Sequence, residues 1–337
     1  MKQVDVVIIG AGPAGTVCGY LLKQAGISTL LVDHATFPRD KVCGGGLSAR
    51  SWKMLDELIP GFKYEYNRVR KIQLTVNEKH RSDFELDIEL RLVKRREFDN
   101  QLLEVYKSVG GQFQQGGFSR YDETPDGLVV TLKSGQQIEC KYLVGADGSA
   151  SSVRHFLANN HDNGYMILEQ YVQKSPANTI ELGLSRQYDN MGYYYRFPNS
   201  EFDAVGYGDV SVTTDKFRQV LKQKNIPETK IRGCHMYLGN DYPLHDRVIL
   251  IGDAGGFANR VTFEGIKAAF ETARNAAEAI KTGRPFREVN AYLFEKLAKE
   301  ERFAQFIYKP SSLKFVAILC HIPGAIKWFF DSCLRPR

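Results

Sequence analysis

Hydrophobic residues near the amino terminus gather in short runs that a turn signal separates. Residues 4–9 (VDVVII) form a β-branched run, which is typical of a strand buried on both faces of a parallel sheet. The next segment predicts a helix over Ala14–Gln24, which ends at Gly26, and then a second strand over Ser28–Val32. This order of strand, helix and strand favours an α/β fold.

Further apolar and β-branched segments predict a sheet in the middle of the chain. The strands that we expect are Val69–Val76, Phe84–Val93, Tyr165–Val172, Thr179–Leu184, Gly192–Phe197 and Ala204–Val210. A short surface helix is expected at Asp215–Gln223, and from Phe286 onward the pattern becomes helical.

Three glycines follow the first strand at a spacing that suits a dinucleotide. Gly10 permits a tight turn, Gly12 lets the backbone approach a pyrophosphate, and Gly15 lets the helix pack close to the strand. The helix start at Pro13 and Ala14 offers unpaired N–H groups and a partial positive charge to the phosphates. Dinucleotide binding is the better explanation, and a coincidental glycine turn is the alternative.

Acidic residues at other strand ends identify which dinucleotide is expected. Asp33, followed by His34, ends the second strand, where a carboxylate accepts hydrogen bonds from ribose hydroxyls. Asp147 follows a strand in YLVGADG, and Asp253 follows another in RVILIGDAGG. The helix after Asp253 starts at Gly265 and Ile266 and offers further N–H groups. A nicotinamide enzyme has no need of this second loop, whereas an extended FAD does.

The predicted organisation is therefore a Rossmann-type (GR2-like) FAD-binding domain interrupted by a sheet. We assign residues 1–65, 94–160 and 245–284 to the discontinuous FAD-binding domain. Residues 66–93 and 161–244 are assigned to an inserted antiparallel β-sheet substrate domain that covers the flavin. Residues 285–337 form a helical carboxyl-terminal segment.

Several motifs together resemble the FAD-dependent class that includes para-hydroxybenzoate hydroxylase, and within it the geranylgeranyl reductase family. The stretch KVCGGGLS (Lys41–Ser48) is similar to a family motif, as is YYYRFPNSEFDAVGYG (Tyr193–Gly208), where Tyr195 replaces a tryptophan. In RREFDNQLL, Arg95 takes the place of an arginine that reaches the cofactor in such proteins. The resemblance covers residues 1–285 and is more specific for cofactor and fold than for substrate.

The resemblance implies that Cys43, Gly44, Gly45 and Gly46 line the flavin, the glycines letting backbone lie beside the ring without a Cβ clash. Cys43 is a candidate catalytic residue that would tune the flavin, position substrate or deliver a proton. The alternative is that Cys43 is a small buried packing residue.

Alternating aromatic residues predict one wall of a substrate pocket. Tyr193, Tyr195 and Phe197 share one face of a strand, unless they are plain core. Arg260 and Phe263 replace a proline and a glycine of the family pattern NPLTGEGI, close to the expected ring position. Both would alter size and charge in that pocket.

Composition bears on metal sites, disulfides, nucleic-acid binding and cellular location. The 337 residues are 43% hydrophobic and 25% charged, as in ordinary globular proteins. Six cysteines and seven histidines are scattered without metal-ligand spacing, so we expect no metal site and no disulfide framework. A net charge of +6 without basic, aromatic-rich runs indicates no nucleic-acid partner. We expect no signal peptide and a cytoplasmic protein.

The carboxyl-terminal segment has an apolar middle, Phe315–Phe330, which Pro323 and Gly324 interrupt. It is too interrupted for a transmembrane span, and basic residues flank it: Lys314, Lys327, Arg335 and Arg337. The pattern suits an interfacial helix or a lid over a lipid pocket, peripheral to the inner face of the membrane. A terminal helix that packs on its own protein is an equal alternative.

The expected function is that of an FAD-dependent oxidoreductase that reduces a carbon–carbon double bond in a polyprenyl or other lipid-like substrate. No second dinucleotide motif is evident, so NAD(P)H would bind transiently or ferredoxin would supply electrons. Cys43, Tyr193 and water remain candidate proton donors. A flavin monooxygenase acting on an aromatic or lipid substrate is the alternative within enzymes. A non-catalytic flavoprotein, or one that modifies a partner protein, is a third possibility.

Overall fold

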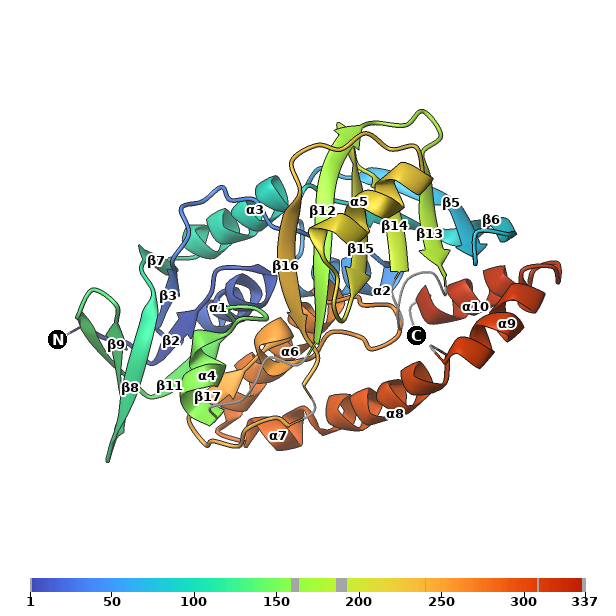
Figure 1. Cartoon of the computed structure of the whole chain (residues 1–337). Helices are drawn as coiled ribbons and strands as arrows, with labels where there is room; N and C mark the ends of the chain where they lie inside the picture. The colour runs from blue at the N-terminus through green and yellow to red at the C-terminus, as the bar shows by residue number, and fades with distance from the viewer. Residues whose placement is uncertain (1, 159–163, 186–192, 240, 308, 335–337) are drawn as a thin grey trace.

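A five-stranded parallel sheet forms around the first buried strand in the computed structural model, which describes residues 2–158, 164–185, 193–239, 241–307 and 309–334 (Figure 1). The strand order is β17-β11-β2-β3-β7. Their bounds are Val248–Leu250 for β17, Tyr142–Gly145 for β11, Val6–Ile9 for β2, Thr29–Asp33 for β3 and Gln112–Gln115 for β7. All neighbours pair in parallel, so their carboxyl ends meet at one edge, as sequence analysis predicted for an α/β fold.

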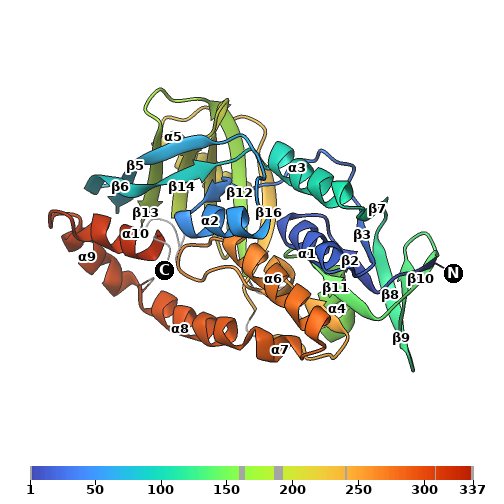
Figure 2. The ribbon, with the colours of Figure 1, turned by 180° about the vertical axis from the view of Figure 1, so that it is seen from behind.

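Helices pack against this sheet through small and apolar side chains. They are α1 (Pro13–Gln24), α3 (Arg95–Ser108) and α6 (Ile266–Thr282), with α2 (Ala49–Leu58) beside α6 and α4 (Ser152–Ala158) near η1, the 3₁₀ turn Gly252–Gly255. Figure 2 shows α1 and α6 side by side. Small alanine side chains are buried on both helices, Ala14 on α1 and Ala269, Ala273 and Ala276 on α6.

A four-stranded sheet that the sequence pattern did not predict lies at the amino-terminal side of the molecule (Figure 1). Its order is β1 (Lys2–Gln3), β10 (Gln137–Cys140), β9 (Gly127–Leu132) and β8 (Phe118–Thr124). Its apolar residues join those of β2, β3 and β11 in one buried cluster, so this small sheet closes one face of the parallel sheet.

The predicted central strands form one eight-stranded sheet. Its order is β16 (Arg232–Tyr237), β12 (Gly164–Gln173), β15 (Phe202–Asp209), β14 (Tyr193–Pro198), β13 (Thr179–Leu184), β5 (Asn67–Val76), β6 (His80–Leu92) and β4 (Gly46–Leu47). The sheet is antiparallel, as expected, except that β13 pairs with β5 in parallel. These two strands are separated by a long connection, so no hairpin dictates their direction. Gly192, expected in β14, lies outside the described residues.

Helix α5 (Thr214–Gln223) covers the outer face of this sheet, where Tyr194, Tyr207 and Phe217 are buried together (Figure 1). The opposite face is left for the cavity described below. Alternation along β14 therefore divides its aromatic residues between two environments.

The chain ends in helices α7 (Phe286–Val289), α8 (Ala291–Ile307), α9 (Pro310–Leu319) and α10 (Ala325–Leu334). They run from α6 back to the far edge of the eight-stranded sheet (Figures 1 and 2). There Leu313, Ala317 and Ile326 are buried against Leu74 and Val76 of β5. Within the described ranges, none of the helices is both long and apolar enough to cross a membrane.

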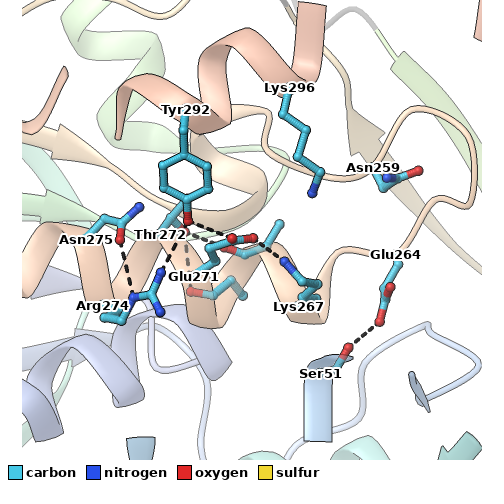
Figure 3. A network of polar contacts seen from close by, with 12 residues as sticks. Ser51, Asn259, Glu264, Lys267, Glu271, Thr272, Arg274, Asn275, Tyr292 and Lys296 are labelled. Atoms are coloured by element: carbon cyan, nitrogen blue, oxygen red, sulfur yellow. Dashed lines mark hydrogen bonds and ion pairs between the residues drawn. The ribbon is translucent and has the colours of Figure 1, made fainter. Parts of the chain in front are cut away.

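A partly buried polar network anchors these helices to α6 (Figure 3). Glu271 of α6 pairs with Lys267, and the Tyr292 hydroxyl of α8 donates to Glu271 Oε1 at 2.6 Å. Arg274 donates to the Tyr292 oxygen at 3.2 Å. Burial opposes ionisation of Glu271, but Lys267 and Tyr292 outweigh it and the pKa of Glu271 is lowered. The charged carboxylate of Glu271 therefore holds the start of α8 against α6.

The first prediction concerns Tyr106, which holds α3 against the parallel sheet. Its ring lies where Cβ atoms on Gly19 and Gly111 would stand, 2.8 and 2.4 Å from ring carbons, and its hydroxyl is 2.8 Å from Thr29 Oγ1. Tyr106→Ala should lower the free energy of unfolding by about 3–5 kcal/mol. Tyr106→Phe removes only the hydroxyl and should cost about 1 kcal/mol. Urea unfolding measures both, and equal losses would contradict the importance of the ring.

Candidate functional site

One cavity of about 960 Å³ lies at the carboxyl edge of the parallel sheet and continues along the inner face of the eight-stranded sheet. Residues from the ends of β2, β3 and β11, from the Cys43–Gly46 stretch, and from β14, α9 and α10 line it. Most predicted site residues line this cavity, although they come from segments far apart in sequence. Gly15 and Arg260 are exceptions.

The glycine turn leaves open space in front of α1. A Cβ on Gly10 would lie 2.3 Å from the carbonyl oxygen of Ala146, and one on Gly15 would lie 1.9 Å from that of Gly10. Both glycines therefore permit close packing of turn, helix and sheet. A Cβ on Gly12 would meet only Arg39 Nη2, at 3.5 Å. The first amides of α1 thus border a space that fits a pyrophosphate.

Asp33 lies at the carboxyl end of β3, where the sequence predicted it. Its two oxygens accept hydrogen bonds from the amides of Ala11, at 2.7 Å, and Ala35, at 2.8 Å. These bonds hold the carboxylate beside the glycine turn, and His34 follows it on the cavity lining. The position suits an acceptor for ribose hydroxyls.

Asp147 and Asp253 have different surroundings. Asp147 caps α4, since the Ser152 amide and the Ser151 hydroxyl donate to its carboxylate at 2.7 and 2.5 Å. Asp253 borders the cavity, and within the part of the chain that the structure describes no hydrogen bond or ion pair engages its carboxylate. A Cβ on Gly265 would lie 3.0 Å from Asp253 Oδ1, and Ile266 begins α6 beside it. Asp253 is therefore available to a cofactor hydroxyl.

Arg95 is held by a partner that sequence analysis missed. Asp99, fully buried on the same helix, accepts both Nε and Nη2 of Arg95 at 2.8 Å, and Arg39 Nη2 lies 3.2 Å from it. Arg95 also lies beside the Cys43 thiol. Both arginines line the cavity, so Asp99 positions two guanidinium groups there. The spacing of four residues between Arg95 and Asp99, which brings side chains together on a helix, was the signal that could have identified it.

Residues 43–46 line the cavity, but protein neighbours explain why the glycines are needed. A Cβ on Gly44 would lie 2.3 Å from the Phe197 ring. Gly45 has a φ of 72°, and a Cβ there would lie 2.0 Å from the Val93 carbonyl oxygen. The backbone therefore packs directly against the eight-stranded sheet. Closeness to a flavin, which the family resemblance implied, remains a prediction.

A buried carboxyl group that the sequence did not indicate lies behind Cys43. Glu169 of β12 is 1% exposed, its Oε1 accepts the Cys43 amide at 3.2 Å, and its Oε2 accepts the Tyr195 hydroxyl at 2.7 Å. Burial raises the pKa of Glu169 to about 7, although these hydrogen bonds and the charges of Arg232 and Arg95 oppose the shift. A glutamate within an ordinary strand pattern carries no signal of this kind.

Aromatic side chains form a continuous wall. Tyr193, Tyr195 and Phe197 follow one another along β14, with ring centroids 5.8 and 5.2 Å apart, and all three line the cavity. Phe263 stacks on Tyr193 with centroids 5.0 Å apart and planes 3° from parallel. Phe263 has a φ of 57°, a left-handed conformation that costs a side chain about 1–2 kcal/mol. Stacking on Tyr193 offsets part of that cost.

Arg260 is not among the residues that line the cavity, contrary to its predicted place in the substrate pocket. It is 3% exposed, and its guanidinium donates to the carbonyl oxygens of Ala258, at 3.2 Å, and Gly239, at 2.9 Å. Its Nε lies 3.4 Å from a Glu301 oxygen on α8. These partners turn Arg260 toward α8, so it braces the loop before α6.

Beyond the aromatic wall the lining becomes aliphatic. The apolar residues that extend the cavity come from β5, β6, β13, α9 and α10: Ile72, Leu74, Leu90, Leu92, Ile180, Leu182, Val316, Leu319, Ile326 and Phe330. Phe303, Phe306 and Phe315 also line it, although 44%, 60% and 59% of their surfaces are exposed. They mark where this apolar arm meets solvent.

The glycine turn before α1, Asp33 and Asp253 together form what we call the dinucleotide cradle. Comparisons with known proteins agree with a dinucleotide-binding function for it. The family model "FAD binding domain" matches residues 3–172. A menaquinone reductase of Mycobacterium tuberculosis is 25% identical over 82% of this chain and 76% of its own. A chloroplastic geranylgeranyl diphosphate reductase of Arabidopsis thaliana is 26% identical over 84% and 66%. A pyrrole-carbonyl carrier-protein brominase of Pseudoalteromonas luteoviolacea is 24% identical over 83% and 78%.

A solved structure shares the fold across nearly the whole chain. It is a geranylgeranyl bacteriochlorophyll reductase-like protein from Thermoplasma acidophilum, with a TM-score of 0.73 and 16% identity over 99% of this chain and 91% of its own. The chain belongs to the FAD binding domain family, as a flavoprotein oxidoreductase that resembles the geranylgeranyl reductases.

Proposed function

We propose that this flavoprotein reduces carbon–carbon double bonds of a polyprenyl or similar lipid-like substrate. The observation that carries the proposal is the single cavity that joins the dinucleotide cradle to a long arm of aliphatic and aromatic side chains. An apolar chain gains about 25 cal/mol for each Å² that it buries, so such an arm favours a hydrocarbon tail over a small polar substrate. Relatives named as geranylgeranyl diphosphate and menaquinone reductases support the same class.

The residues present fit FAD in this cradle. The amides at the start of α1 and Gly12 would hold the pyrophosphate, Asp33 the ribose, and Asp253 a further hydroxyl. Reduced FAD supplies a hydride to its substrate. The contribution of the chain is to bind and orient the double bond beside Cys43 and the aromatic wall, and to exclude water with apolar side chains.

NAD(P)H, bound transiently, or ferredoxin would supply the electrons. Basic residues that line the cavity, the half-buried Lys41 and the exposed Lys133, suit an anionic donor of either kind.

The second prediction tests the reaction itself. Chemically reduced enzyme, kept without oxygen, should be reoxidised by geranylgeranyl diphosphate or menaquinone, and the product should gain two hydrogen atoms for each double bond reduced. Rapid-mixing absorbance of the flavin and mass spectrometry of the product measure both. A monooxygenase would leave the substrate unchanged until oxygen is admitted and would then add an oxygen atom, which would refute the proposal.

The third prediction uses two neighbouring glycines with different surroundings. Gly12→Val should yield folded but colourless protein, because its side chain enters only the space that the pyrophosphate would fill. Gly15→Val is the contrasting variant, since a Cβ there meets the Gly10 carbonyl oxygen at 1.9 Å, and it should fail to fold. Circular dichroism reports folding, and flavin absorbance reports FAD. Normal FAD content in folded Gly12→Val protein would show that the cofactor binds elsewhere.

Access to the apolar arm leads us to propose contact with an anionic membrane surface. The exposed phenylalanines at its mouth lie near exposed basic residues of α8, α9 and their connection, namely Lys299, Arg302, Lys309 and Lys314. Aromatic side chains flanked by lysine and arginine suit the boundary between anionic headgroups and acyl chains.

The fourth prediction tests that contact. The double variant Phe306→Ser/Phe315→Ser should bind phosphatidylserine-containing vesicles at least tenfold more weakly than wild type, with FAD retained, since each inserted aromatic contributes about 1.5–3 kcal/mol. Val210→Ser/Leu244→Ser is the matched control, because these exposed residues do not line the cavity. Cosedimentation measures binding. Equal binding by both double variants, or none by wild type, would exclude this mouth as a membrane contact.

A further inference from the structure

A row of three residues crosses the middle of the eight-stranded sheet. Glu169 of β12 lies opposite Gly206 of β15, and Gly206 lies opposite Tyr195 of β14. Residues paired directly across strands point to the same face, so all three belong to the face that borders the cavity. The sheet register therefore places a carboxyl group and a phenol on either side of a position without a side chain.

Gly206 is what allows the two outer residues to meet. A Cβ on Gly206 would lie 2.1 Å from Tyr195 Cζ and 2.3 Å from its hydroxyl oxygen. The tyrosine ring thus lies across the glycine, and its hydroxyl reaches Glu169 Oε2 at 2.7 Å. No residue larger than glycine at position 206 is compatible with this contact.

The two oxygens of Glu169 have different partners. Oε1 accepts the Cys43 amide at 3.2 Å, which can only donate, so the proton of a neutral Glu169 belongs on Oε2, toward Tyr195. Glu169 is 1% exposed and is not part of the cavity lining, whereas Tyr195 is. A proton held by Glu169 can therefore reach the cavity through the Tyr195 hydroxyl.

We propose that Tyr195 is the acid that protonates the second carbon of the reduced double bond, and that Glu169 is the positioning residue that replaces the proton. This inference rests on the proposed alkene reduction and supplies the donor that sequence analysis left open among Cys43, Tyr193 and water.

The hydride and the proton reach different carbons of the double bond. Reduced FAD would supply the hydride to one alkene carbon, and the Tyr195 hydroxyl gives its proton to the electron pair of the broken π bond at the other carbon. The Oε2 proton of Glu169 moves to the tyrosine oxygen, so Glu169 ends as a carboxylate. The alkene gains two electrons, which the flavin loses. After the product leaves, water that enters the cavity returns a proton through Tyr195 to Glu169.

The groups around Glu169 bear on its titration. They are Tyr195 on β14, Tyr171 on the same strand β12, Arg232 and Cys234 on β16, Arg95 on α3, and Cys43. Arg232 and Arg95 favour the carboxylate, whereas burial favours the neutral acid and prevails. As the pH rises through about 7, the neutral fraction of Glu169 therefore falls, and the rate of proton delivery should fall with it.

The fifth prediction compares variants in the oxidation of anaerobically reduced enzyme by geranylgeranyl diphosphate or menaquinone. Tyr195→Phe should slow this step by about 10²–10⁴-fold, while reduction of the flavin by dithionite stays unchanged. Glu169→Gln should slow it as well and should abolish the fall in rate near pH 7. Wild type should show a solvent deuterium isotope effect that Tyr195→Phe alters. Tyr194→Phe, on the opposite face of β14, is the matched control and should behave as wild type.

A readout independent of turnover completes the test. Infrared difference spectra between pH 5 and pH 9 should contain a carboxylic acid band that titrates near pH 7 in wild type and is absent from Glu169→Gln. The relay is overturned if that band is missing, if Tyr195→Phe keeps its rate and isotope effect, or if Tyr193→Phe loses them instead. If wild type reduces neither substrate, the proposed function fails and the relay with it, whereas a normal wild type with an unimpaired Tyr195→Phe refutes the relay alone.

Discussion

The site depends on how closely the backbone of residues 43–46 approaches the eight-stranded sheet. Phe197 occupies the space where Gly44 would carry a side chain, and the Val93 carbonyl occupies that space at Gly45. The Val93 amide donates to the Gly45 carbonyl at 2.9 Å, and the stretch then continues into β4, which pairs with β6. Because the Cys43 amide also donates to Glu169 of β12, this stretch is tied to two strands of that sheet, β6 and β12.

Two buried carboxyl groups beside this stretch have opposite kinds of neighbours. Asp99 receives contacts from the guanidinium groups of Arg95 and Arg39, so burial there holds positive charge at the cavity. The nearest partners of Glu169 are a phenol and an amide, both neutral, and burial raises its pKa to about 7. A carboxyl group with neutral donors, such as Glu169, can exchange a proton near neutrality.

The cavity is continuous from the carboxyl edge of the parallel sheet to the apolar side chains of α9 and α10. The carboxyl edge of a parallel sheet is a general place for a dinucleotide, and many folds share it. In this chain α9 and α10 return to β5 and extend that edge by an apolar arm within the same cavity. The contacts of Lys327 with Asp87 and Asp331 and the buried pairing of Glu271 hold these helices in place. The apolar arm, on which the proposed substrate class rests, therefore depends on helices that carry none of the family motifs.

The sequence alone determined the parallel sheet, the glycine turn, Asp33, and the shared face of Tyr193, Tyr195 and Phe197. These features follow from local periodicity and from spacing within one strand–turn–helix unit, which neighbouring residues dictate. The sequence did not predict the small sheet of β8, β9 and β10, the parallel pairing of β13 with β5, or the buried position of Arg260 beside α8. It also missed Asp99 and Glu169. Glu169 meets Cys43 across 126 positions of sequence, and only the register of β12, β15 and β14 sets Tyr195 against it. Pairing between distant segments depends on how sheets and helices pack in three dimensions, and no local pattern encodes that packing.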